Sequence, residues 1–177
     1  MYINFSMKII IIIVSIIHFN LFSNECNEGF IDVENNCYYE QDLFVLEKFI
    51  LNSNLLISPI ELGVQEWENG RLISLCYSMY EIDGCEETTP LLGNIPTEIY
   101  LLDKLVDLRL LGNNLDGSIP QELGYLTNLE YLDLSYNNLI GSIPNSFQNL
   151  FNLTDLYISN NNFVGTLDII CNMINLR

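Results

Sequence analysis

The sequence predicts an α/β solenoid, in which short coils of the chain stack so that their strands form one parallel β-sheet. Three observations lead to this fold class. Leucine, glycine and proline recur every 24 residues through the second half of the chain. Within each repeat, leucines alternate with polar residues at the two-residue period of a half-buried strand. Upstream, apolar residues with helical spacing could cover the first coil.

The repeat is carried by several columns of residues in one register, which identifies stacked repeats before any local structure is considered. The columns with a 24-residue step are Leu91, Leu115, Leu139 and Phe163; Gly93, Gly117, Gly141 and Gly165; Ile95, Ile119, Ile143 and Leu167; Pro96, Pro120 and Pro144; Leu105, Leu129 and Leu153; Leu108, Leu132 and Leu156; Leu110, Leu134 and Ile158; and Asn113, Asn137 and Asn161. One coil cannot bury its own leucines, so neighbouring coils must stack.

Each column has a physical role. Leu132 and Leu134 flank an outward position, as on a strand with one buried face. The asparagines follow the strands, where a side-chain amide can bond the backbone of its own turn and of the next coil. Stacking should therefore produce an asparagine ladder. The glycines permit a tight backbone path, and the prolines fix an extended or turn geometry on the convex side.

The residues from Gly117-Ser118-Ile119-Pro120 through Leu134-Ser135-Tyr136-Asn137-Asn138-Leu139 closely resemble the plant-type extracellular leucine-rich-repeat family. That family includes receptor-kinase ectodomains and polygalacturonase-inhibiting proteins, and similar repeats occur in exported microbial proteins. The resemblance is specific over residues 91–167 and looser over 42–90. It implies a right-handed curved superhelix, a concave parallel β-sheet and a protein, peptide or carbohydrate ligand, without indicating which one.

Residues 24–71 are predicted to form an N-terminal cap, and residues 72–177 the repeats. A helix is expected over 42–51 with Asp42 as its N-cap, because Leu43, Leu46, Phe49 and Ile50 have helical spacing. With Trp67 and a loop closed by Cys26 and Cys37, it resembles the helical cap of family members.

The first strand is predicted at Leu72, Leu75 and Tyr77. The step from Leu72 to Leu105 is 33 residues, nine more than the repeat, so the first repeat should carry an insertion at about 78–90. At the other end, Ile170, Met173 and Leu176 begin a further repeat that is incomplete at Arg177. This favours a fragment or a truncated gene product over a genuine end or an end that is buried in a partner.

Residues 1–23 are predicted to be a secretory signal peptide, with Lys8 followed by an unbroken apolar run from Ile9 to Ile17. The run is far shorter than the ~20 residues that cross a bilayer as a helix. No stable membrane span is therefore expected in the mature chain, and the expected location is secreted or cell surface.

Removal of residues 1–23 would leave five Lys or Arg against 23 Asp or Glu, a formal charge of −18. Phosphate backbones repel such a chain, so nucleic acid is not expected as a partner. Export permits disulfides, and the two close pairs are Cys26–Cys37 and Cys76–Cys85. Cys171 is the odd cysteine, either a buried small side chain or half of a pair whose partner lies elsewhere.

The alternation that turns leucines inward turns the residues beside them outward, in two ladders across neighbouring strands. One ladder is Ser74, Asp107, Tyr131 and Asp155, and the other is Cys76, Arg109, Asp133 and Tyr157. The predicted ligand-binding residues on the concave face are Asp107, Arg109, Tyr131, Asp133, Asp155 and Tyr157. Tyrosine joins an apolar ring to a hydrogen-bonding tip, so Tyr131, Tyr157 and Arg109 are favoured. Asp133 and Ser135 could equally be ordinary repeat residues.

No enzymatic activity, cofactor or metal is expected. A chain without a mature histidine excludes Ser-His and Cys-His chemistry, and Asp107 with Asp155 would lie apart on an open sheet. The acids Glu81, Asp83, Glu86 and Glu87 lack EF-hand spacing and are read as a solvated loop. Asn152-Leu153-Thr154 fits a glycosylation acceptor or ordinary repeat sequence. The leading hypothesis is recognition by the concave face, and the alternative is a structural spacer in a larger surface protein.

Overall fold

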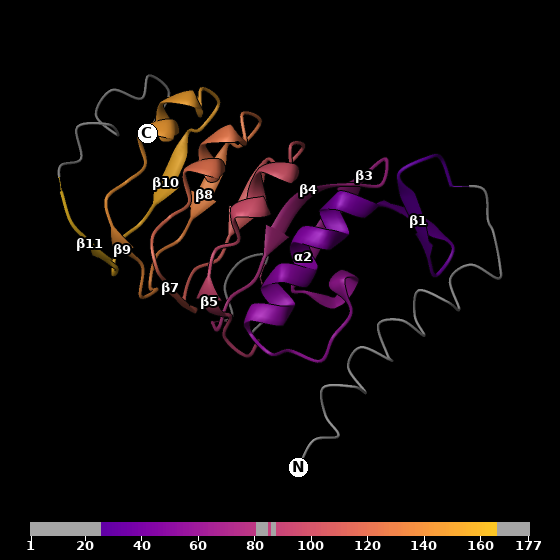
Figure 1. Ribbon diagram of the computed structural model, residues 1–177, viewed down its shortest axis with the longest axis horizontal. Helices are drawn as coiled ribbons and strands as arrows, with labels where there is room; N and C mark the ends of the chain where they lie inside the picture. Colours follow the sequence, from indigo (N-terminus) through magenta and orange to yellow (C-terminus); the bar gives the residue numbers. More distant parts are fainter. Residues whose placement is uncertain (1–25, 81–84, 86–87, 166–177) are drawn as a thin grey trace, which may run out of the picture.

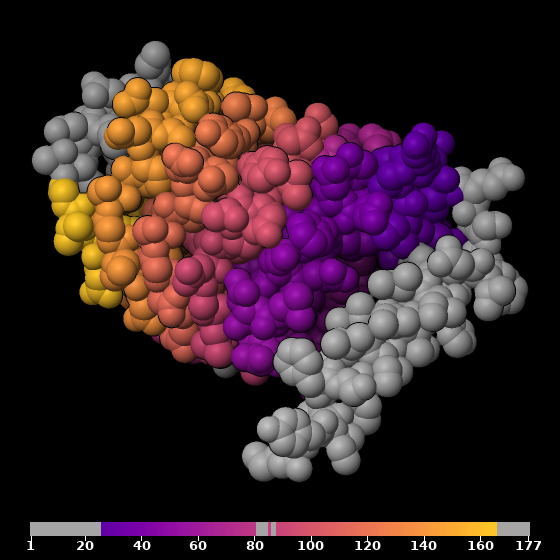
Figure 2. Space-filling view, in the orientation of Figure 1, coloured from indigo at the N-terminus to yellow at the C-terminus, as the bar shows by residue number. Residues whose placement is uncertain are grey.

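The computed structural model describes residues 26–80, 85 and 88–165. Coils of chain stack from the cap helix at one end to the last described strand at the other (Figure 1). In the space-filling view they form successive bands, from indigo at the cap to yellow (Figure 2). The cap consists of β1 (Phe30–Val33), β2 (Asn36–Tyr39), α2 (Glu40–Asn52), η1 (Pro59–Glu61) and β3 (Val64–Glu68).

The coils contribute one strand each to a main sheet, with the order β10-β8-β6-β4-β3. Its members after the cap are β4 (Arg71–Cys76), β6 (Asp107–Arg109), β8 (Tyr131–Asp133) and β10 (Asp155–Tyr157). These four strands are parallel, and only β3 runs antiparallel, against β4. The predicted α/β solenoid with a parallel sheet is confirmed.

Shorter strands and 3₁₀ helices complete each coil. They are β5 (Leu92–Asn94), η2 (Thr97–Leu101), β7 (Asn114–Asp116), η3 (Gln121–Tyr125), β9 (Ile140–Gly141), η4 (Asn145–Asn149) and β11 (Asn162–Phe163). Pro96, Pro120 and Pro144 precede the three helices with φ of −65°, −67° and −62° and extended ψ. Proline is pre-set for this φ, so the repeated proline fixes where each helix begins.

The core is the stack of leucine columns that the sequence predicts. Leu108, Leu132 and Leu134 are fully buried, and the last described coil contributes the partly buried Leu156 and Ile158. Asparagine side chains close the turns between coils. Asn137 Nδ2 donates to the carbonyls of Leu110 and Leu134 at 2.8 and 3.1 Å, while its Oδ1 accepts from the amide of Leu115 at 3.1 Å. Asn113 and Asn161 make the same bonds, so the asparagine ladder is confirmed.

The cap differs from the prediction at the start of its helix. The predicted N-cap role of Asp42 is wrong, because α2 begins at Glu40 and Tyr39 is its N-cap. Asp42 lies in the first turn, fully buried, and accepts hydrogen bonds from Arg71 and from the amide of Leu72. A carboxylate in the first turn suits the helix dipole, so it has the same sequence signature as a capping aspartate. The predicted contribution of Trp67 to the cap is seen in its edge-on contact with Tyr38.

The insertion is folded back on the first coils where it is described. The amide of Met79 donates to Gly112 O at 3.3 Å, and the amide of Thr88 donates to Ser78 O at 3.0 Å. The predictions for the signal peptide, for the acids Glu81, Asp83, Glu86 and Glu87, for Cys171 and for the incomplete last repeat lie outside the described residues. Within the described ranges, no helix has the length and apolar character needed to cross a membrane.

Candidate binding surface

The candidate site is the face of the main sheet that carries the outward side chains of β6, β8 and β10. We call it the ladder surface, defined by Asp107, Arg109, Tyr131, Asp133, Asp155 and Tyr157. The strand register places Ser74, Asp107, Tyr131 and Asp155 in one column and Cys76, Arg109, Asp133 and Tyr157 in the next. The structure therefore brings all six predicted residues together in the predicted order.

At the β6 end of the ladder surface, Arg109 is already bound within the protein. Its Nε and Nη2 donate to the two carboxylate oxygens of Asp107 at 3.0 and 2.6 Å. Its guanidinium carbon lies 4.5 Å from the centroid of the Tyr131 ring, in cation–π range. The hydrogen bonds from Asp107 raise the pKa of Arg109 above its ordinary value, although burial opposes them. The charge of Arg109 is thus balanced, and its side chain covers one side of Tyr131.

The two predicted tyrosines differ in accessibility. Their ring centroids lie 5.4 Å apart with a tilt of 37° between the rings. Tyr131 is half-buried between Arg109 and Tyr157, and burial, with the nearby charge of Asp133, raises the pKa of its phenol. Tyr157 is 46% exposed and presents its ring outward. Tyr157 is therefore the aromatic group that a partner can reach, and Tyr131 supports it from behind.

The aspartates of β8 and β10, Asp133 and Asp155, differ in burial and in hydrogen-bond partners. Asp133 is 7% exposed, and its Oδ1 accepts hydrogen bonds from the amide and hydroxyl of Ser135. This arrangement favours the reading of Asp133 as an ordinary repeat residue that ties the end of its strand. Asp155 is less buried, and its Oδ2 accepts from the hydroxyl of Thr154 at 2.7 Å.

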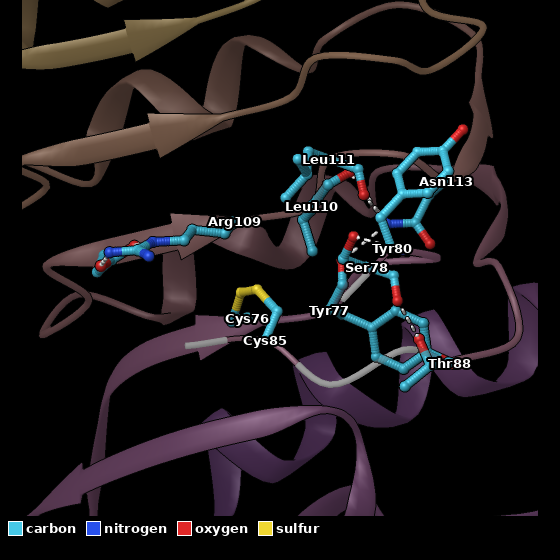
Figure 3. The surroundings of a disulfide bond; sticks show 11 residues. Cys76, Tyr77, Ser78, Tyr80, Cys85, Thr88, Arg109, Leu110, Leu111 and Asn113 are labelled. Atoms are coloured by element: carbon cyan, nitrogen blue, oxygen red, sulfur yellow. Dashed lines mark hydrogen bonds and ion pairs between the residues drawn. A yellow bond between two sulfur atoms is a disulfide. The ribbon is translucent and has the colours of Figure 1, made fainter. Parts of the chain in front are cut away.

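Both predicted disulfides are present, with Cα–Cα distances of 5.6 Å for Cys26–Cys37 and 5.4 Å for Cys76–Cys85. The second one bears on the ladder surface, because Cys76 is the register neighbour of Arg109 (Figure 3). It ties the insertion to the β4 end of the ladder. The part open to a partner therefore runs from β6 to β10.

Sequence reasoning missed a second aromatic pair beyond the ends of the strands. Tyr80 and Tyr136 are 47% and 55% exposed, and their rings meet edge-on at a centroid distance of 6.5 Å. Tyr80 lies against Gly112, which occupies the position held by Tyr136 and Asn160 in the next two coils. The sequence signal for this contact was the glycine at a position where the next two coils have larger side chains. All three residues have φ between 54° and 62°.

A separate open groove flanks the edge where the main-sheet strands begin. It is lined by Glu68, Asn69, Arg71, Ile73, Lys104, Val106, Asn128, Glu130 and Asn152.

The exposed Asn152 donates from Nδ2 to Thr127 O at 2.8 Å, which is the role of a repeat asparagine. Among the described residues, no group of three or more His, Cys, Asp or Glu is placed to hold a metal ion.

The chain is similar to known leucine-rich-repeat proteins. Residues 103–163 match the family described as leucine rich repeat. The LRR ectodomain of the receptor kinase GASSHO1/SCHENGEN3 from Arabidopsis thaliana, solved in complex with CASPARIAN STRIP INTEGRITY FACTOR 2, is similar at 29% identity and a TM-score of 0.63. Residues 103–163 are leucine-rich repeats, and the solenoid has the fold of plant extracellular leucine-rich-repeat ectodomains. That similarity covers 77% of this chain and 17% of the receptor chain.

Two further structures have the same leucine-rich-repeat fold. The BIR3–SERK2 complex from Arabidopsis thaliana is similar at 27% identity and a TM-score of 0.59, over 76% of this chain and 77% of the other. The PEPR1–AtPEP1 complex, at 24% identity, shares the fold with a TM-score of 0.64 over 77% of this chain and 20% of the receptor. No curated protein sequence matches this one. The chain spans a fifth or less of the two longer receptor ectodomains.

Proposed function

We propose that this leucine-rich-repeat domain is a non-enzymatic binding module, secreted or held at the cell surface, that recognises a protein, peptide or glycan through the ladder surface. The observation that carries the proposal is the exposed ring of Tyr157, supported by Tyr131 on the adjacent strand. Exposed tyrosines on rigid elements are typical energetic anchors of interfaces.

Two findings support the extracellular binding role. The two disulfides are typical of oxidising compartments. Two of the similar structures are complexes, one of a receptor-kinase ectodomain with CASPARIAN STRIP INTEGRITY FACTOR 2 and one of BIR3 with SERK2. The proposal extends recognition of a partner from those proteins to this chain.

We propose no catalytic role for the ladder surface. The one acid pair that could be considered for hydrolysis is Asp107 with Asp155. Asp107 is held by two hydrogen bonds from Arg109, so it is not free to act as a nucleophile or base. Asp155 stands two strands away on an open sheet, where water reaches any bound substrate.

The test compares two truncations of exposed tyrosines. The secreted full chain is screened with random dodecapeptides displayed on phage and with a glycan array, and each hit is then measured by calorimetry. Tyr157→Ala should weaken binding by roughly 1 to 3 kcal/mol, the usual cost of losing an aromatic anchor. Tyr125→Ala is the matched control, because Tyr125 is 51% exposed but lies on η3, away from the ladder surface.

Tyr157→Ala loses the ring contact with Tyr131, worth about 1 kcal/mol, so its unfolding temperature should fall by only a few degrees and the variant should stay folded during the binding measurement. Equal binding by the Tyr157 and Tyr125 variants would show that the ladder surface is not the recognition site. In that case the alternative role, a structural spacer within a larger surface protein, would be favoured.

A further inference from the structure

Every described cation of the chain is already paired with an acid. Lys48 pairs with Glu98, Lys104 with Asp103, and Arg109 with Asp107, at 3.4, 3.3 and 2.6 Å. The fourth, Arg71, is shared by Asp42 and Asp103. The chain has a formal charge of −17, so cations are scarce and each has a fixed place.

The β8 and β10 end of the ladder surface differs, because its acids have no such partner within the part of the chain that the structure describes. Among the described residues, no lysine or arginine forms an ion pair with Asp133 or Asp155. Asp133 is turned to Ser135, whereas Asp155 lies beside Tyr131 in the register and two residues before the exposed Tyr157 on the same face. A carboxylate and an accessible aromatic ring therefore stand together at this end.

A related cluster on the same surface already holds a cation between a carboxylate and a tyrosine ring. On β6 and β8, the carboxylate of Asp107 holds the guanidinium of Arg109, which in turn lies 4.5 Å from the centroid of Tyr131. On β10, Asp155 and Tyr157 supply a carboxylate and an accessible ring, and no lysine or arginine of the described residues pairs with Asp155. An aromatic face beside a carboxylate attracts an arginine or lysine through cation–π and ionic interactions together.

We infer that the partner is a peptide or exposed protein segment that places an arginine or lysine side chain between Asp155 and the ring of Tyr157. This inference rests on the proposed function and adds the chemistry of the partner. A neutral glycan fits less well, because Tyr131 is covered by Arg109 and Tyr157 and offers no second open ring for stacking. The acidic surface also steers a cationic segment toward the site.

The experiment is a double-mutant cycle on the dodecapeptides selected against the full chain. We expect these peptides to share an arginine or lysine. The peptide cation is replaced by citrulline or acetyl-lysine, and the protein carries Asp155→Asn. Each single change should weaken binding about tenfold, and both together should weaken it little more than one. Asp116→Asn is the matched control, since it removes one exposed carboxylate from β7, which pairs with β5 and lies outside the main sheet. It should change affinity less than twofold.

Each outcome decides between the two proposals. The inference is wrong if neutralising the peptide cation lowers affinity by the same factor on the Asp155→Asn protein as on the original. It is also wrong if the selected peptides carry no shared cation. In both cases the proposed function stands, provided that Tyr157→Ala weakens binding. Neutral glycans that bind through Tyr157 while peptides do not would likewise overturn the cationic partner alone. If no probe depends on Tyr157, both proposals fail.

Discussion

Arg71 donates from Nε and Nη2 to the two carboxylate oxygens of Asp42, at 2.9 and 3.1 Å, and thereby joins the first turn of α2 to β4. Asp42 is fully buried and also accepts from the amide of Leu72 at 2.9 Å. The guanidinium of Arg71 lies 4.1 Å from the centroid of the Tyr39 ring. One acid in the cap helix therefore organises the junction between the cap and the first coil.

The first prediction concerns this junction. Asp42→Ala should lower the free energy of unfolding by about 3 kcal/mol, because it leaves the Arg71 charge and the Leu72 amide without their buried acceptor. Glu47→Ala, on an exposed position of the same helix, should change it by less than about 0.5 kcal/mol. Urea denaturation measures both values. Equal stabilities of the two variants would mean that Asp42 does not hold the cap.

The second prediction is a pH dependence at Asp103, the other acid bound to Arg71. Burial alone would raise the pKa of Asp103, but the hydrogen bonds and charges of Arg71 and Lys104 together outweigh burial and lower it. The stabilisation from Asp103 is therefore present above its unfolded pKa, about 3.9, and is lost as the pH falls through the lower folded pKa. Because the side chain is 53% exposed, its worth is below about 1 kcal/mol.

Unfolding of the original protein and of Asp103→Asn, followed from pH 7 downward, tests the sign. The original should be the more stable above about pH 5, and the two should converge below about pH 4 as Asp103 is protonated. A difference that grows toward acid would contradict the prediction. The pH dependence of stability that Asp42 contributes has the opposite sign to that of Asp103. Burial raises the pKa of Asp42 despite its hydrogen bonds from Arg71 and Leu72. The pH-dependent part of the stabilisation by Asp42 is therefore present below the unfolded pKa and is lost as the pH rises through the folded one.

Most of the fold was predictable because each repeat column has one physical role. The leucine period fixes which residues face the core, and stacking coils of equal length fixes the register of the sheet. The ladders through Tyr131 and Tyr157 follow from these two facts. The two disulfides follow from the close spacing of their cysteines.

The errors and omissions arise where the local structure depends on a side chain that is far away in the sequence. Asp42 was expected at the N-cap because a capping acid and a first-turn acid have the same local sequence. Only Arg71, 29 residues later, distinguishes them. Likewise, alternation places Tyr131 and Tyr157 on one face but gives no indication that Arg109 covers the first. The contact of Tyr80 with Gly112 depends on how the insertion folds, which the repeat does not encode.

The third prediction concerns the asparagine ladder. Asn137→Ala should cost about 3 kcal/mol of unfolding free energy, because it removes buried hydrogen bonds to Leu110 O and from the Leu115 amide in the neighbouring coils. Asn138→Ala, at the adjacent exposed position, is the control and should cost less than about 0.5 kcal/mol. Amide hydrogen exchange of Leu115 should accelerate only in the Asn137 variant. Unchanged protection there would refute the role of the ladder.

The last prediction tests how the insertion is held. Gly112 has φ of +62°, and a Cβ at this residue would lie 2.4 Å from Cδ2 of Tyr80. Gly93 has a similar φ of +73°, but its Cβ would meet nothing closer than 3.5 Å. Both alanine substitutions therefore carry the backbone cost of roughly 1 to 2 kcal/mol for a left-handed residue. Only Gly112→Ala also displaces the Tyr80 ring from its edge-on contact with Tyr136.

The difference between the two variants isolates the contact of Tyr80. Gly112→Ala should be the less stable by about 1 kcal/mol, the value of an aromatic pair. In the NMR spectrum, the ring signals of Tyr80 and Tyr136 should shift in Gly112→Ala and stay in place in Gly93→Ala. If the stabilities are equal and neither ring moves, Tyr80 does not rest on Gly112 in solution. A shift of both rings with equal stabilities would mean that the ring is displaced at no net cost, which contradicts the predicted stabilising role of the pair.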